Sequence, residues 1–105
     1  MQRAILFKVK DKDTWVKWCE ELATTLHEES LETLNEEGVR QEMTMIFTVN
    51  KVDYVLGYVD GEMLPANMNR EINQKHKAMK EQCLELIVDA DVNILYNLKT
   101  KDSDF

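Results

Sequence analysis

Residues 42–59, which read EMTMIFTV, then NK, then VDYVLGYV, decide the fold of this 105-residue chain. Two runs of alternating residues, typical of β-strands, are separated only by Asn50 and Lys51. Because Asn tolerates a positive φ angle, a two-residue hairpin turn fits at this point. The turn sets a register that places bulky apolar residues opposite one another on one face and mixed pairs on the other. The predicted pairs are Val49–Val52, Phe47–Tyr54, Met45–Leu56 and Met43–Tyr58 on the apolar face, and Thr48–Asp53, Ile46–Val55 and Thr44–Gly57 on the mixed face.

The segment before the hairpin predicts one strand and one long helix. Residues 3–10 are rich in strand-forming types, and Asp11 and Asp13 follow as candidate helix N-caps. Apolar residues then recur at helical spacing, at Trp15, Trp18, Cys19, Leu22 and Leu26. Gly38 marks the end of the helical pattern. An unbroken helix over 14–37 would be about 36 Å long, too long for a domain whose radius of gyration is about 13 Å. We therefore expect a break near His27–Ser30.

The segment after the hairpin predicts a second helix and a last strand. The helix has the clearest periodicity in the chain, along Met68, Ile72, His76, Met79, Cys83 and then Leu86 or Ile87. Alternation over 91–99 predicts the last strand. The order β-α-β-β-α-β predicts an α+β, ferredoxin-like fold with a four-stranded antiparallel sheet and its helices on one face. One domain over 1–100 is expected, with 101–105 as a frayed C-terminal tail.

Composition narrows the classes of partner. Twenty acidic and thirteen basic residues give a net charge of −7 and an isoelectric point near 4.8. Such an acidic chain argues against nucleic acid and against an anionic membrane surface, because both bind mainly through Lys and Arg. No apolar run is long enough for a membrane span or a signal peptide, so a cytoplasmic protein is expected. Cys19 and Cys83 have no CxxC partner and are interpreted as small buried residues. The sequence contains no motif for a metal, a phosphate loop or a cofactor, and none is expected.

The strands carry more apolar residues than one helix-covered face needs. We place Ile5, Phe7 and Val9 on the apolar face with Met43, Met45, Phe47 and Val49, and regard the other face as mixed. Two helices cover only one face of such a sheet, and the second would leave a large apolar patch in water. The sequence therefore predicts a homodimer packed through its sheet face. A cavity between the paired sheets, suited to a small molecule, is expected beside Gly57.

The element order and the broken first helix ending in Leu34-Asn35-Glu36-Glu37-Gly38 resemble the dimeric α/β-barrel superfamily. The stretch 64–73, LPANMNREIN, with Lys75-His76-Lys77 after it, is similar to a family of short, uncharacterised bacterial proteins of that type. The superfamily resemblance implies a homodimer, and activities that include sugar mutarotases, cofactor-free monooxygenases and small-ligand-binding modules. The chain departs from the mutarotase pattern. Alignment on Gly38 puts Ala23 where that family has its helix histidine, with His27 one turn late, and Glu42 or Thr44 replaces an aromatic hydroxyl.

Two interpretations of function remain open. The first is a small-ligand-binding or regulatory module, with Thr44, Thr48, Gly57, Asn93 and Asn97 as candidate ligand-binding residues around the cavity between the sheets. The alternative is a cofactor-free enzyme, isomerase-, mutarotase- or monooxygenase-like, in which His76 or His27 carries a proton. Each histidine also has a structural interpretation, His76 as a hydrogen-bonded core residue and His27 as part of a solvated break. Neighbouring side chains or water filling the gap beside Gly57 is the alternative to a ligand.

Overall fold

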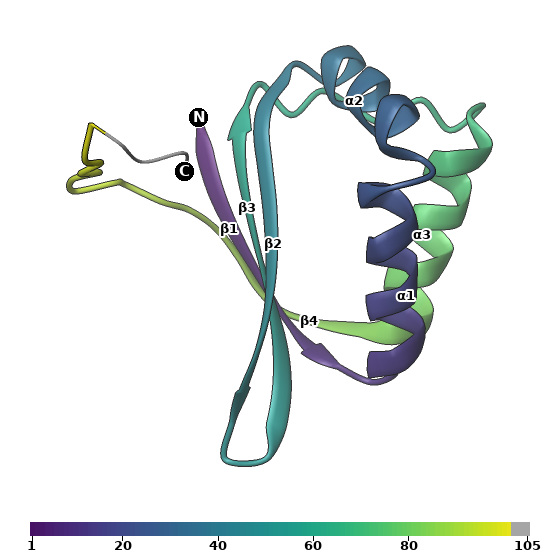
Figure 1. Ribbon diagram of the computed structural model, residues 1–105, viewed down its shortest axis with the longest axis horizontal. Helices are drawn as coiled ribbons and strands as arrows, with labels where there is room; N and C mark the ends of the chain where they lie inside the picture. Colours follow the sequence, from purple (N-terminus) through teal and green to yellow (C-terminus); the bar gives the residue numbers. More distant parts are fainter. Residues whose placement is uncertain (102–105) are drawn as a thin grey trace.

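The protein, described over residues 1–101 by a computed structural model, is a single four-stranded antiparallel sheet with its helices on one face (Figure 1). The strand order is β2-β3-β1-β4, so β2 and β4 are the two edges. The α+β prediction, with one antiparallel sheet and helices on one side, is confirmed. The predicted tail falls, apart from Lys101, outside the described residues. The elements are β1 (Gln2–Val9), α1 (Lys12–Ala23), α2 (His27–Glu36), β2 (Val39–Val49), β3 (Val52–Gly61), α3 (Glu71–Cys83) and β4 (Leu84–Asp91).

The hairpin of β2 and β3 has the predicted turn and the predicted register. Asn50 and Lys51 have φ angles of 51° and 67°, as a two-residue hairpin turn with both central residues in the left-handed region requires. All seven predicted pairs, from Val49–Val52 to Met43–Tyr58, are partners in the sheet. The turn and the alternation therefore agree on one register.

The break in the first helix is also confirmed, and it lies directly before His27. The carboxylate of Asp11 accepts from Thr14 N at 3.2 Å and caps α1, which ends at Ala23. A turn follows, and α2 then begins at His27. The Ser30 hydroxyl holds the two helices together, because it lies 2.7 Å from the carbonyl oxygen of Leu26 and 3.2 Å from that of Leu22.

Arg70 joins α2 to the segment before α3. Its guanidinium lies 3.0 Å from a carboxylate oxygen of Glu36, 3.2 Å from one of Glu32 and 3.9 Å from one of Glu29. The acidic helix thus lies beside a basic residue of the same chain. Exposed ion pairs contribute little to stability, so the network fixes the position of α2 more than it stabilises the fold.

The prediction of the last strand was wrong in its position. The fourth strand is β4, Leu84–Asp91, which pairs with β1 from Arg3–Asp91 to Val9–Leu84 with a bulge beside Leu6 and Phe7. Helix α3 ends at Cys83, whereas the spacing of Leu86 and Ile87 had suggested that it continued. These two residues fit the periodicity of a helix as well as that of a strand, and the pairing of this segment with β1 makes it a strand. The strand was predicted over residues 91–99, but residues 92–100 have no regular secondary structure.

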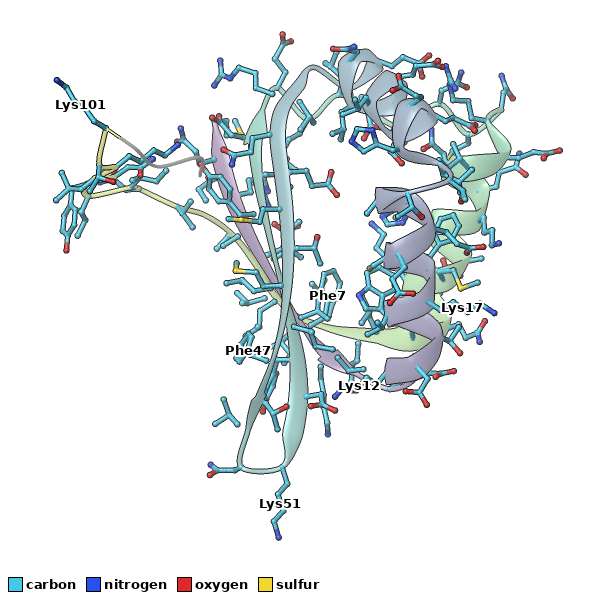
Figure 2. The ribbon with its side chains drawn as sticks, in the orientation of Figure 1. Phe7, Lys12, Lys17, Phe47, Lys51 and Lys101 are labelled. Carbon is cyan, nitrogen blue, oxygen red and sulfur yellow. The ribbon has the colours of Figure 1, made fainter. Side chains whose placement is uncertain are left out.

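The assignment of β1 to the apolar face was wrong as well. Ile5 pairs with Gly57 and Phe7 with Val55, so the odd residues of β1 share a face with the mixed side of the hairpin. This face meets the helices. Figure 2 shows Phe7 on the helix side of the sheet and Phe47 on the opposite side. The main buried cluster lies between the helices and this face, and comprises Trp15, Trp18, Val55, Ile72, Cys83 and Leu84.

The sheet face turned away from the helices is called the open face below. Its residues form rows across the strands, and the row Met45–Leu56–Leu6–Val88 crosses all four. Met45 and Val88, at the two ends of this row, keep 40% and 47% of their surface exposed. The open face also includes Met43, Phe47, Val49, Ala4, Tyr54, Tyr58 and Ala90.

Candidate functional site

The candidate site is built around His76, which α3 places against α1. His76 follows Ile72 by four residues and precedes Cys83 by seven, so all three share the face of α3 that meets the core. Its ring centroid lies 5.9 Å from that of Trp15 and 6.2 Å from that of Trp18. Two indoles therefore hold the imidazole in one position.

A hydrogen bond fixes the protonation state of His76. The indole N–H of Trp18 donates to Nδ1 of His76 at 2.9 Å. An accepting Nδ1 carries no proton, so the neutral ring bears its proton on Nε2. Burial, with a smaller contribution from the positive charge of Lys80, lowers the pKa of His76 from 6.5 to about 4. His76 is therefore neutral at physiological pH.

His76 opens into a cleft of about 70 Å³ between the helices and the sheet. This volume holds a few water molecules or one polar group of a ligand. Strand β2 is exposed along nearly its whole length, so the cleft is open to solvent on that side. The lining residues are Ile5, Phe7, Val55, Gly57 and Val59 from β1 and β3, Glu42 and Thr44 from β2, and Trp15, His76 and Lys80 from the helices.

The free nitrogen of His76 is available in this cleft. Within residues 1–101, every buried side-chain nitrogen or oxygen has a hydrogen-bond partner. Nε2 of His76 makes no such bond there, so it is accessible to solvent. Since His76 lines the cleft, its Nε2–H is a hydrogen-bond donor for a molecule in the cleft.

Glu42 and Lys80 add charge to the same cleft. Desolvation raises the pKa of the Glu42 carboxyl, and the positive charge of Lys80 offsets part of that effect. Glu42 is an exposed residue, but it lines the cleft, where neighbouring atoms replace part of the surrounding water. This loss of water accounts for the raised pKa of its carboxyl. The cleft thus combines a neutral donor, a cation and a carboxyl that binds its proton more tightly than usual.

The sequence-predicted residues divide into two groups. His76, Thr44 and Gly57 come together in the cleft. Thr48 lies on the same sheet face but near the turn, where its hydroxyl bonds to Asp53 at 2.5 Å. His27 is exposed at the start of α2, and Asn93 and Asn97 are exposed in the segment after β4, so none of these three lines the cleft.

The position expected for the cavity was therefore wrong. Thr44 and Gly57 face the helices of their own chain, so they cannot line a space between two paired sheets. The reason is the register between β1 and β3, which turns the mixed face of the hairpin inward.

The family of this chain follows from a sequence comparison. The sequence model of a family of unknown function, DUF6176, matches residues 3–102, which is nearly the whole chain. The chain belongs to DUF6176. Searches of curated proteins and of solved structures each gave no match. DUF6176 brings no assigned activity, so function has to be argued from the cleft.

Sequence reasoning missed four residues of this site: Trp15, Glu42 and Lys80, which line the cleft, and Trp18, which donates to His76. Two of them had a usable signal. Lys80 follows His76 by four residues, which places both on one side of a helix. Glu42 precedes Thr44 by two residues, which places both on one side of a strand. The bond from Trp18 to His76 joins residues 58 positions apart and had no local signal.

A larger hollow of about 520 Å³ lies elsewhere, and it is a weaker candidate. It is lined by Met1, Gly38, Arg40, Gly61, Glu62 and Leu64 at one end of the sheet. It is more open to solvent than the cleft and has no histidine in its lining, so volume alone favours it. The chemistry favours the smaller cleft.

The remaining reactive groups point to packing roles. Cys19 and Cys83 are free thiols, and burial raises the pKa of Cys19 to about 11. Thiols in that state are poor nucleophiles. Among residues 1–101, no three His, Cys, Asp or Glu side chains are grouped closely enough to hold a metal ion. No helix in that range has the length and apolar character needed to cross a bilayer.

Proposed function

We propose that this protein is a small-ligand-binding or regulatory module whose site is the cleft around His76. The observation that carries the proposal is the Trp18–His76 hydrogen bond, which leaves Nε2–H as a fixed donor in the cleft. Lys80 lies beside it with a positive charge, and Thr44 offers a hydroxyl from the opposite wall. These groups suit a carbonyl or carboxylate oxygen, which accepts hydrogen bonds and is stabilised by positive charge.

The protonation state of His76 favours binding over proton transfer by this residue. With a pKa of about 4, the protonated imidazole is scarce at pH 7, so His76 is a poor general acid. A neutral N–H that is already oriented loses little entropy when a ligand accepts from it. The histidine therefore serves as a hydrogen-bond donor in this proposal.

A second function, a cofactor-free enzyme, is favoured by Glu42. Its carboxyl has a raised pKa and lines the same cleft as the His76 donor. A carboxylate of that kind can accept a proton from a carbon next to a carbonyl group, while Nε2–H stabilises the developing oxyanion. In this isomerase-like alternative, the proton carrier is Glu42, and His76 stabilises charge.

The binding proposal is tested by NMR titration with acetate, acetone and pyruvate as probes. We expect the His76 ring signals and the amide signals of Thr44 and Gly57 to shift with at least one probe. His76→Phe keeps an aromatic ring but removes the donor, and it should weaken that binding at least tenfold. His27→Phe is the matched control on an exposed histidine and should leave the binding unchanged. Equal binding by wild type and His76→Phe would contradict the proposal.

The enzyme alternative is tested with the same probes in deuterated water. Exchange of the pyruvate methyl protons that is faster than with buffer alone, and that is lost in Glu42→Gln, favours catalysis. Exchange at the buffer rate, together with saturable binding, favours the binding module.

We also propose that the working unit is a homodimer packed through the open face. The support is the apolar row Met45–Leu56–Leu6–Val88, which is unusual for a sheet face left in water. Such packing leaves the cleft accessible, because the cleft lies on the helix side. Sedimentation equilibrium at micromolar concentration tests this, with a dimer expected. A monomer at that concentration would refute it.

A further inference from the structure

Residues 92–100, called the arm below, leave the body of the protein at the end of β4. Within residues 1–101, one hydrogen bond is recorded between the arm and the rest of the chain, from Val92 N to Gln2 O at 3.0 Å. Figure 1 shows the arm extending away from the sheet on the side opposite the helices, and Figure 2 places Lys101 far from the body. The arm is therefore held at its base only.

The composition of the arm does not suit a free segment in water. Large apolar side chains make up almost half of it, and Leu95, Tyr96 and Leu98 are 86%, 78% and 84% exposed. Large apolar side chains are seldom left together in water. Ile94, Tyr96 and Leu98 alternate with Asn93, Leu95 and Asn97, so an extended arm presents an apolar side and a mostly polar side.

The open face is apolar like the arm and lies on the same side of the sheet (Figure 1). It carries Met43, Met45, Phe47, Val49 and Val88, each 40–48% exposed. Taking about 170 Å² for one large side chain, these five residues and the apolar side of the arm, Ile94, Tyr96 and Leu98, expose roughly 730 Å² per chain. A stable dimer of standard size buries about 800 Å² per partner. The exposed apolar surface of one copy is thus close to what contact with a second copy needs.

The strand order indicates that the arm of one copy meets the other copy. The arm continues β4, whereas Met43, Met45 and Phe47 lie on β2 at the opposite edge of the sheet. A two-fold axis that runs between two facing sheets, along the strands, brings the β4 edge of each sheet over the β2 edge of the other. The contact is then isologous, and each arm covers the partner at the place where its own arm does not reach.

We propose that two copies of this chain exchange their arms, so that residues 92–100 of each pack on the open face of the other. This inference rests on the proposed homodimer and adds the element that holds it together. The apolar side of the arm, Ile94, Tyr96 and Leu98, supplies the contact with Met43, Met45 and Phe47 of β2. The cleft on the helix side takes no part in the contact.

The test compares two variants of the full chain by sedimentation equilibrium. The first replaces the apolar side of the arm, Ile94→Ser, Tyr96→Ser and Leu98→Ser, and the dimer dissociation constant should rise at least 100-fold. The matched control changes the polar side, Asn93→Ser and Asn97→Ser, and should stay within threefold of wild type. Fluorescence of Trp15 and Trp18, which lie in the core far from the arm, should be unchanged in both and so shows that the fold is intact.

Cross-linking distinguishes exchange from a contact within one chain. In a Cys19→Ser background, one chain carries Met45→Cys and another carries Tyr96→Cys, and the mixture is oxidised. A disulfide between the two chains is expected. When both cysteines are placed in one chain, the disulfide should again form between two copies. A disulfide formed only within single chains would overturn the exchange.

The remaining outcomes separate this inference from the homodimer itself. If the apolar-side variant dimerises as tightly as wild type, the arm plays no part and the inference fails, while the homodimer stands. If wild type is itself monomeric, the homodimer fails and the arm exchange fails with it.

Discussion

Acidification should destabilise this protein through the buried imidazole of His76. In the folded chain burial holds the pKa of His76 at about 4, against 6.5 for an unperturbed histidine. Below pH 6.5 the unfolded chain therefore binds a proton that the folded chain does not take up until the pH approaches 4. Stability from this group is fully present above pH 6.5, falls as the pH drops and levels off below 4.

The magnitude follows from the difference in pKa. At 1.36 kcal/mol per pKa unit, the full loss is about 3 kcal/mol, and about 2 kcal/mol of it occurs between pH 7 and pH 5. This is a large share of the 5–15 kcal/mol typical of a small domain. The cause is burial of the imidazole, with a smaller contribution from the positive charge of Lys80. In addition, a protonated Nδ1 cannot accept the Trp18 N–H.

Urea unfolding followed by tryptophan fluorescence measures this loss, with protein concentration held constant. His76→Gln keeps an acceptor for Trp18 and removes the titration, so its free energy of unfolding should fall about 2 kcal/mol less than that of wild type from pH 7 to pH 5. His27→Gln should follow wild type. Equal pH dependence in wild type and His76→Gln would refute the reasoning.

Three further predictions concern the same site and the sheet beside it. Trp18→Phe should cost about 2–4 kcal/mol in urea unfolding, because it removes the donor to His76 and core volume, and NMR titration should show the pKa of His76 rising toward its usual value. Gly61→Ala should lower the free energy of unfolding by at least about 3 kcal/mol, since φ is 152° and an added Cβ would lie 2.3 Å from a carbonyl oxygen. Gly57→Ala should lower it by under about 1 kcal/mol, because an added Cβ there would lie 3.8 Å from its nearest atom. Thermal unfolding of the two variants measures both costs, and similar melting temperatures would contradict the comparison. Glu42→Gln should raise the free energy of unfolding at pH 7, because burial disfavours the charged carboxyl, and the gain should shrink at pH 4, where wild-type Glu42 is protonated too.

The sequence was sufficient to predict a structure where residues close together in the chain determine it. Asn50 and Lys51 lie between two alternating runs, and the register of β2 and β3 follows from these residues alone. The break before His27 follows from the length of the helix against the size of the domain. In both cases no distant part of the chain was needed.

The sequence was insufficient where strands far apart in the chain decide. Whether Phe7 faces the helices depends on its pairing with Val55, and nothing near either residue sets that register. The fourth strand was placed too late for the same reason, because Leu86 and Ile87 fit a helix until the segment that contains them pairs with β1. The alternation over 91–99, interpreted as a strand, lies almost entirely in the arm.

The candidate site was predictable in part. His76 stood out because a histidine on an apolar helix stripe needs a partner, and Thr44 and Gly57 stood out as a small gap on a strand face. Their meeting in one cleft was not predictable, because it requires the face of the hairpin to be known. The hydrogen bond from Trp18 depends on how α1 packs against α3.

The most direct test of this account is the state of His76 in the folded protein, measured by ¹⁵N NMR of the imidazole nitrogens. We expect a neutral ring at pH 7 with its proton on Nε2 and an unprotonated Nδ1, and a pKa of about 4 on titration. A proton on Nδ1, or titration near 6.5, would contradict it, since the cleft would then lack the fixed donor on which the proposed function depends.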